Sequence, residues 1–159
     1  MASEIGVQII QHTNGTDAMT IDSSGRVGLS SPVAFFVRSG NSNTSAGNVI
    51  TSWSTPVVNE GNGFSTSTGR FTAPVAGIYV LSFTILADND STMTNIFLRK
   101  NGSDYLKARD DTSNSRYQTI SGTAVMSMAV NDYADLFASN NDVGGHGNEW
   151  QNFTGFLLG

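Results

Sequence analysis

Apolar and polar residues alternate most regularly in the middle of the chain, over residues 78–86. One face of this segment carries the larger apolar side chains, Tyr79, Leu81, Phe83 and Ile85. The opposite face is apolar at one end, at Ile78 and Val80. Because the run is short and rich in β-branched and aromatic residues, it predicts a central β-strand. Such a strand needs cover on both faces, so we expect a neighbouring subunit against the second one.

Further short apolar segments are separated by turns rich in Gly, Asn and Ser. They predict strands at 33–38, 49–53, 96–100, 104–108, 118–130, 133–138 and 150–158. The dipeptide Asn101-Gly102 predicts a tight hairpin between two of them. In the segment 118–130 the residues Ala124, Met126, Met128 and Val130 are expected on one face. Many short strands without a helical stretch predict an all-β sandwich or jelly roll over residues 32–159.

The pattern of residues 1–31 differs from that of residues 32–159. It predicts an extended N-terminal arm with short strands at 5–10 and 18–21. The apolar residues of this arm alternate as in edge-pairing strands: Ile5, Val7, Ile9, Met19 and Ile21. They are too few to stabilise two strands alone, so we expect them to dock on another protein or another arm. The alternatives are a flexible leader or the first strands of the main domain.

Composition narrows the class of protein. A chain of 159 residues with 38% hydrophobic residues suits one domain with an appendage. Only 13% of the residues are charged, a balance common in extracellular or virion β-proteins. The net charge of −5 and the scattered basic residues argue against nucleic-acid binding. There is no cysteine for disulfides, no basic leader with a long apolar block, and no run near the ~20 apolar residues of a membrane span.

The sequence contains few residues that could support catalysis or bind a metal. The two histidines, His12 and His146, cannot form a multi-histidine zinc site or support a paired nucleophile. The acidic runs at 88–90 and 110–111 could offer oxygen ligands to calcium, but their spacing is not specific for it and favours solvated turns. We therefore expect no enzyme, no resident metal and no cofactor.

Several short segments, taken in order along the chain, together form a recognisable sequence pattern. They are NEG at 59–61 with Phe64, TGRFTAPVAGIYVLSF at 68–83, LRKNG at 98–102, SGTAV at 121–125 with Asn131-Asp132, and FTGFLL at 153–158. This pattern resembles the globular head of complement first-component subunit q and its tumour-necrosis-factor relatives. The resemblance implies a jelly-roll sandwich that forms a compact homotrimer through one sheet. Members of this family sometimes hold calcium near the trimer apex.

Within that fold the residues divide into two expected sets. The subunit interface is expected to contain Ile78, Val80, Phe156 and Leu158. The core is expected to contain Phe71, Tyr79, Leu81, Phe83 and Phe153.

The sequence departs from the family in two ways, since it shows no collagen-like stalk and no secretory leader. Both departures argue against an animal complement role. The arm sequence TDAMTIDSSGRV at 16–27 resembles linking segments of tailed-bacteriophage structural proteins. Together these features predict a virion protein of the capsid or tail surface, assembled in the host cytoplasm and attached by its arm to the major capsid protein or another virion protein. The favoured role is capsid decoration or cementing. The alternatives are a fibre-tip module that binds a host receptor or glycan, and a free bacterial or environmental binding protein.

Overall fold

The computed structural model describes residues 6–29, 32–87, 94–110, 118–144 and 149–158. The chain divides into two compact units, Met1–Pro32 and Val33–Gly159, which we call the arm and the head. Every regular element of the described residues is a β-strand. No helix in this part of the chain is long and apolar enough to cross a bilayer.

The arm is a three-stranded antiparallel sheet in the order β1-β2-β3. Its strands are β1 (Ile9–Gln11), β2 (Asp17–Ile21) and β3 (Val27–Leu29). The turn from β2 to β3 is closed by Asp22, whose Oδ1 accepts hydrogen bonds from the backbone N–H groups of Ser24 and Arg26 at 2.8 and 2.9 Å. These bonds, with the Arg26 side chain, lower the pKa of Asp22.

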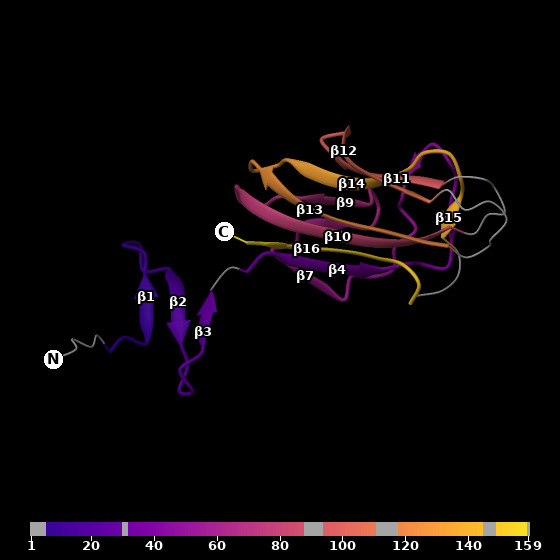
Figure 1. Cartoon of the computed structure of the whole chain (residues 1–159). Helices are drawn as coiled ribbons and strands as arrows, with labels where there is room; N and C mark the ends of the chain where they lie inside the picture. Colours follow the sequence, from indigo (N-terminus) through magenta and orange to yellow (C-terminus); the bar gives the residue numbers. More distant parts are fainter. Residues whose placement is uncertain (1–5, 30–31, 88–93, 111–117, 145–148, 159) are drawn as a thin grey trace. The chain divides into compact units, whose positions relative to one another are not determined.

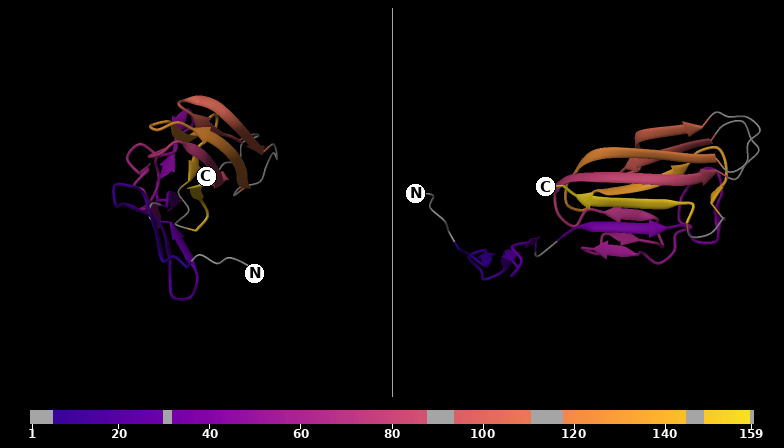
Figure 2. Two further views of the ribbon diagram at one scale, coloured as in Figure 1. Left: turned by 90° about the vertical axis from the view of Figure 1, so that its left-hand side faces the viewer. Right: turned by 60° about the horizontal axis from the view of Figure 1, so that its bottom comes forward.

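The head consists of two layers of antiparallel strands (Figure 1). The first sheet has the order β5-β15-β10-β16-β4-β7, with β13 also paired to β10. Its strands are β4 (Ala34–Arg38), β5 (Asn43–Thr44), β7 (Val58–Glu60), β10 (Gly77–Ala87), β13 (Gln118–Met128), β15 (Val143–Gly144) and β16 (Asn152–Leu157). Figure 2 shows β10, β16 and β4 side by side.

The second sheet has the order β12-β11-β14-β9-β8, with β6 also paired to β14. Its strands are β6 (Asn48–Val49), β8 (Phe64–Ser65), β9 (Arg70–Thr72), β11 (Thr94–Lys100), β12 (Ser103–Asp110) and β14 (Tyr133–Ala138). The inward faces of the two sheets meet in one hydrophobic core. The expectation of an all-β jelly-roll-like sandwich is therefore confirmed.

Aromatic side chains pack against one another in the core. Phe35 stacks on Phe71 with ring centroids 4.7 Å apart and meets the edge of Phe153 at 4.9 Å. Phe71 in turn lies 5.3 Å from the ring of Tyr79. These contacts join strands of both sheets, because Phe35 and Phe153 come from the first and Phe71 from the second.

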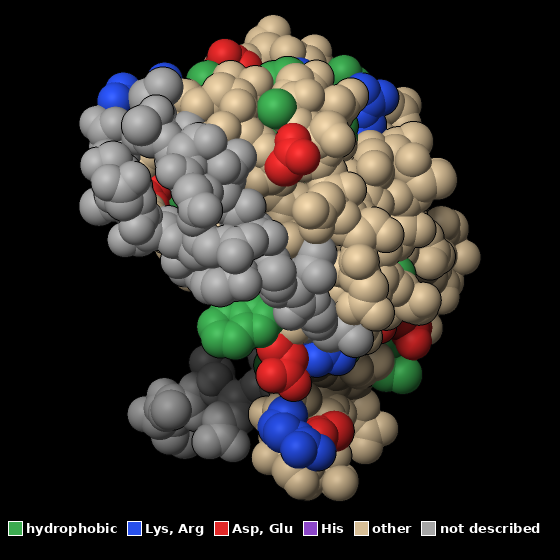
Figure 3. Space-filling model, turned by 90° about the vertical axis from the view of Figure 1, so that its right-hand side faces the viewer, with side chains coloured by type: hydrophobic (Ala, Val, Ile, Leu, Met, Phe, Trp, Pro, Cys, Tyr) green, Lys and Arg blue, Asp and Glu red, His purple; other side chains and the backbone are tan. Residues whose placement is uncertain are grey.

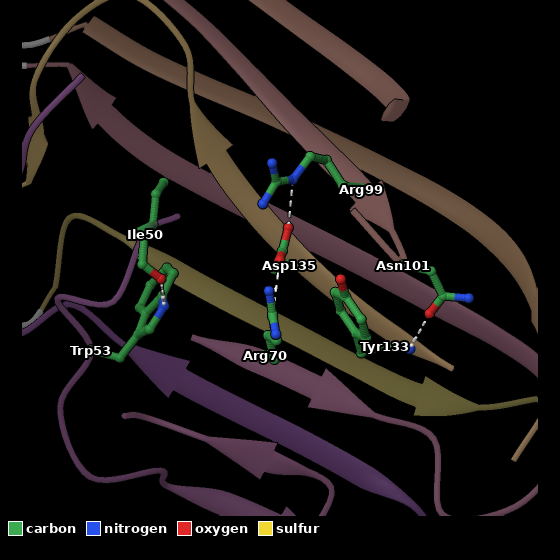
Figure 4. Close-up of polar contacts among 7 residues, drawn as sticks. All are labelled: Ile50, Trp53, Arg70, Arg99, Asn101, Tyr133 and Asp135. Carbon is green, nitrogen blue, oxygen red and sulfur yellow. Dashed lines mark hydrogen bonds and ion pairs between the residues drawn. The ribbon is translucent and has the colours of Figure 1, made fainter. Parts of the chain in front are cut away.

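Several predicted strands have other bounds in the structure, among them those at 49–53 and 118–130. In place of a strand at 49–53, only β6 pairs in the second sheet, and Trp53 forms an isolated bridge with Ser39. The indole N–H of Trp53 donates to the carbonyl oxygen of Ile50 at 2.7 Å, so the segment curls back on itself (Figure 4). The strand predicted to reach Val130 ends at Met128, and Val130 is exposed in the following turn.

Candidate subunit interface

The outward face of β10 is apolar at its beginning. Strand register places Val80 between Val125 of β13 and Phe156 of β16. Directly paired residues of neighbouring strands project from the same face of a sheet, so the three side chains form one row. Val125 is 58% exposed and Phe156 is 47% exposed.

A second apolar row lies beside the first. The backbone N–H of Leu158 donates to the carbonyl oxygen of Ile78 at 2.7 Å, which continues the pairing of β10 with β16. Ile78 is 37% exposed and Leu158 is 65% exposed. We call Ile78, Val80, Val125, Phe156 and Leu158 the apolar face. Contiguous exposed apolar side chains on a sheet mark an interaction surface.

The same sheet face becomes polar further along β10. Ser82 Oγ lies 2.9 Å from Thr123 Oγ1, and the two hydroxyls are hydrogen-bonded across β10 and β13. Thr84 lies between Ser121 and Asn152 in the next outward row. The apolar face is therefore limited to the end of the sheet where β10 begins.

The structure brings the four residues expected at the interface onto this one face. Val125 is a fifth member that the sequence interpretation missed. Its signal was available, because Ala124 and Met126 were assigned to the other face and the residue between them must point outward.

The five residues expected in the core lie between the sheets. Phe71, Tyr79, Leu81, Phe83 and Phe153 are all at most 1% exposed. Tyr79 keeps a partner for its hydroxyl, which donates to the carbonyl oxygen of Val75 at 2.7 Å. Burial raises the pKa of the Tyr79 phenol, and this hydrogen bond opposes the shift.

On the side of the second sheet that faces away from the core, a buried aspartate lies between two partly exposed arginines. Asp135 is fully buried between Arg70 and Arg99, whose Nε atoms lie 3.2 and 2.7 Å from its carboxylate oxygens (Figure 4). Arg70 also stacks over the ring of Tyr133 at 4.1 Å, and Arg99 over Phe137 at 4.3 Å. The carboxylate is thus paired with both guanidinium groups, and each guanidinium group also lies over an aromatic ring.

A second carboxylate closes the turn before β14. Asp132 accepts hydrogen bonds from the Asn101 amide at 2.7 Å and the Ala129 backbone N–H at 2.8 Å, and its Oδ2 lies 2.9 Å from Lys100 Nζ. The Asn101 bond is the largest cause of a pKa lowered to about 2. These contacts tie the Asn101-Gly102 turn to the neighbouring turn.

The residues expected in the docking arm do not share one face. Ile9 pairs with Thr20, whereas Met19 pairs with Ile10, so Ile9 and Met19 project from opposite sides of the arm sheet. Ile21 lies on the same side as Met19, two residues further along β2. Val7 precedes β1 and is 42% exposed. Ile5 lies outside the described residues.

Candidate metal and catalytic groups remain scattered. Within the described ranges, no three His, Asp or Glu side chains gather to hold a metal ion. His12 is exposed in the arm, where its Nδ1 accepts the backbone N–H of Asn14 at 3.3 Å. The acidic run 88–90, Asp111 and His146 lie outside the described residues, and Asp110 ends β12. On the face of the molecule shown in Figure 3, the described charged and hydrophobic side chains lie in small separate groups.

Two packed antiparallel sheets with this strand order define the head as a jelly-roll domain of the C1q and tumour-necrosis-factor class. A family model described as the C1q domain matches residues 34–158. The chain belongs to the C1q family.

Individual relatives agree with this placement. The chain is 32% identical over 117 residues to complement C1q tumor necrosis factor-related protein 3 of Mus musculus, covering 74% of this chain and 46% of that protein. The chain thus spans about half the length of this curated relative.

Solved structures show the same fold. The globular domain of zebrafish complement 1qA protein has a TM-score of 0.66 and 21% identity, and the match covers 80% of this chain and 98% of that one. Eiger TNF from S. frugiperda has a TM-score of 0.70 and 12% identity, with 80% and 93% covered.

These comparisons correct the functional interpretation of the sequence. The assignment to a bacteriophage virion, as a capsid decoration protein or a fibre-tip module, is wrong, because the matched relatives are animal C1q-related proteins. The virion localisation is wrong for the same reason. The phage-like match covers only residues 16–27 of the arm, whereas the C1q match extends across residues 34–158 of the head.

Proposed function

We propose that this chain is a non-enzymatic binding protein whose heads act as a homotrimer, joined through the apolar face of the first sheet. C1q and tumour-necrosis-factor domains are ligand-binding domains that typically form trimers. A trimer presents three copies of each surface loop to a partner, so that weak single contacts add up to firm binding.

This proposal rests on one observation: the outward face of the first sheet is apolar at one end of β10 and polar further along. Phe156, Val80 and Val125 form an apolar row across β16, β10 and β13, while polar side chains occupy the next two outward rows along β10. Removing such apolar side chains from water stabilises an assembly by about 25 cal/mol for each Å² buried. The subunits are therefore joined most strongly at the end where β10 begins.

The proposal is tested by placing a charge on the apolar face. Val80→Asp would bury an unpaired carboxylate between subunits, which costs several kcal/mol, while the partly exposed position lets the single subunit keep its fold. We expect native mass spectrometry to show monomers at micromolar concentration. The matched control is Val130→Asp, at a valine exposed in the turn after β13, which should leave the oligomer intact. A fully trimeric Val80→Asp protein would overturn the assignment of this face.

A further inference from the structure

One face of the arm sheet is apolar across all three strands. Ile10 of β1 pairs with Met19 of β2, and Met19 pairs with Leu29 of β3, so these side chains form one row. Ile21 and Val27 pair with each other and lie two residues from Met19 and Leu29, which places them on the same side. We call these five residues the arm face.

The arm face is open to water within the described arm. Ile10 is 46% exposed, Val27 is 59% exposed and Leu29 is 65% exposed. The opposite side of the sheet is mixed, because there Ile9 pairs with Thr20 and Thr20 pairs with Gly28. A small sheet with one uncovered apolar side needs a second layer for stability.

We propose that the arm faces of the three chains in the trimer pack against one another and form a shared apolar core. This inference rests on the trimer of the proposed function. Each arm supplies one layer, and the apolar face of each arm covers the same face of its two neighbours.

The chemistry of the arm face favours identical copies as its cover. None of its five members is charged, so each can approach its own counterpart about a three-fold axis without like-charge repulsion. Asp17 of β2 lies at the end of the strand, where its Oδ1 accepts a hydrogen bond from Gln11 at 2.6 Å. The face thus combines an apolar centre with a polar margin.

Size and tethering also favour a partner within the same trimer. Stable interfaces between separate proteins bury at least about 1,200 Å², and five side chains of a sheet this small offer a much smaller patch. Copies in one trimer need less, because a short tether raises their effective concentration to the millimolar range. Only four residue steps join Leu29 to Val33 of the head, a reach of at most about 14 Å.

Single cysteines can report contacts between arms, because the natural chain has none. Val27→Cys places a thiol on the arm face, and Thr20→Cys places one at an exposed position on the opposite side. A disulfide requires Cα atoms within about 7 Å. In the full chain under mild oxidation, we expect Val27→Cys to form disulfide-linked dimers at least about tenfold faster than Thr20→Cys.

The oligomeric state of the same samples separates the two proposals. A sedimentation experiment that finds monomers overturns both the trimer and the arm contact. A trimer whose two cysteine variants oxidise at equal rates overturns only the arm contact.

A second readout tests the packing without a cysteine. Val27→Asp should speed amide hydrogen exchange in β2 at least about tenfold, whereas Thr20→Asp should not, because only the first change puts a charge into the shared core. Unchanged exchange in the trimeric Val27→Asp protein would show that the arm face has no cover from other arms.

Discussion

At Gly155, β16 lies close against two side chains of the core. A Cβ atom there would collide with Leu81 Cδ2 and would lie 2.7 Å from Phe35 Cε1. Both neighbours are fully packed, so they cannot move away without disturbing the aromatic cluster. The absence of a side chain at this position is a packing requirement.

We therefore expect Gly155→Ala to lower the free energy of unfolding by about 1–3 kcal/mol, as other overpacked cores do. Urea denaturation at a fixed protein concentration measures the change. Gly6→Ala is the control, since a Cβ at Gly6 meets nothing within 4 Å. Equal midpoints for both variants would show that the core has room at Gly155.

Asp132 gives the fold a defined dependence on acid. Its pKa is about 2 in the folded chain against an ordinary value of 3.8, so the ionised form is favoured by folding. The stability that it contributes is complete above pH 3.8 and is lost as the pH falls towards 2.

Asp132→Asn should remove that dependence, because the side chain no longer titrates. We expect the thermal midpoint of the natural chain to fall more steeply between pH 4 and pH 2 than that of the variant, while the natural chain is the more stable at pH 7. Parallel pH curves would mean that the bonds from Asn101 and Lys100 do not favour the ionised carboxylate.

At the scale of elements, the hairpin of β11 and β12 shows what the sequence could specify. Asn101 and Gly102 have φ angles of 51° and 80°, as the Asn-Gly dipeptide predicts for a tight turn. Side-chain contacts add to this local preference, since Asn101 Oδ1 accepts the backbone N–H of Tyr133 at 2.9 Å (Figure 4).

Gly102→Ala should therefore lower the free energy of unfolding by about 1–2 kcal/mol, because an L-residue is strained at this positive φ. Chemical denaturation measures this change in the free energy of unfolding. Ser103→Ala, at the next exposed residue, is expected to change the free energy by less than about 0.5 kcal/mol. A variant of Gly102 no less stable than this control would contradict the turn assignment.

Elements with their own periodicity could be predicted, and elements that depend on distant partners could not. β10 and the following hairpin carry alternation and turn residues in the sequence itself. β5 and β15 contain two residues each and pair with one another from far apart in the chain, so no local pattern marks them. In the arm, the alternation of the sequence marked Ile9 and Met19 as candidate docking residues, but only the register of β1 on β2 shows that Ile10 is the residue beside Met19.

At the scale of the whole molecule, the head could be placed in its class because its pattern runs through many strands. The family model matches residues 34–158, and most of the short segments that carry the resemblance lie in order within this stretch. The virion interpretation depended in part on one short segment of the arm, at 16–27, whose turn residues occur in many proteins. A pattern that brief describes a local turn and not the assembly in which the chain works.

We propose that the heads associate as trimers through the apolar face of the first sheet. Sedimentation equilibrium of the full chain, over a dilution series through low micromolar concentration, tests it most directly. We predict one species with three times the chain mass of 16.8 kDa across the series. A single species of 16.8 kDa would contradict the claim, and a stable dimer would contradict it equally.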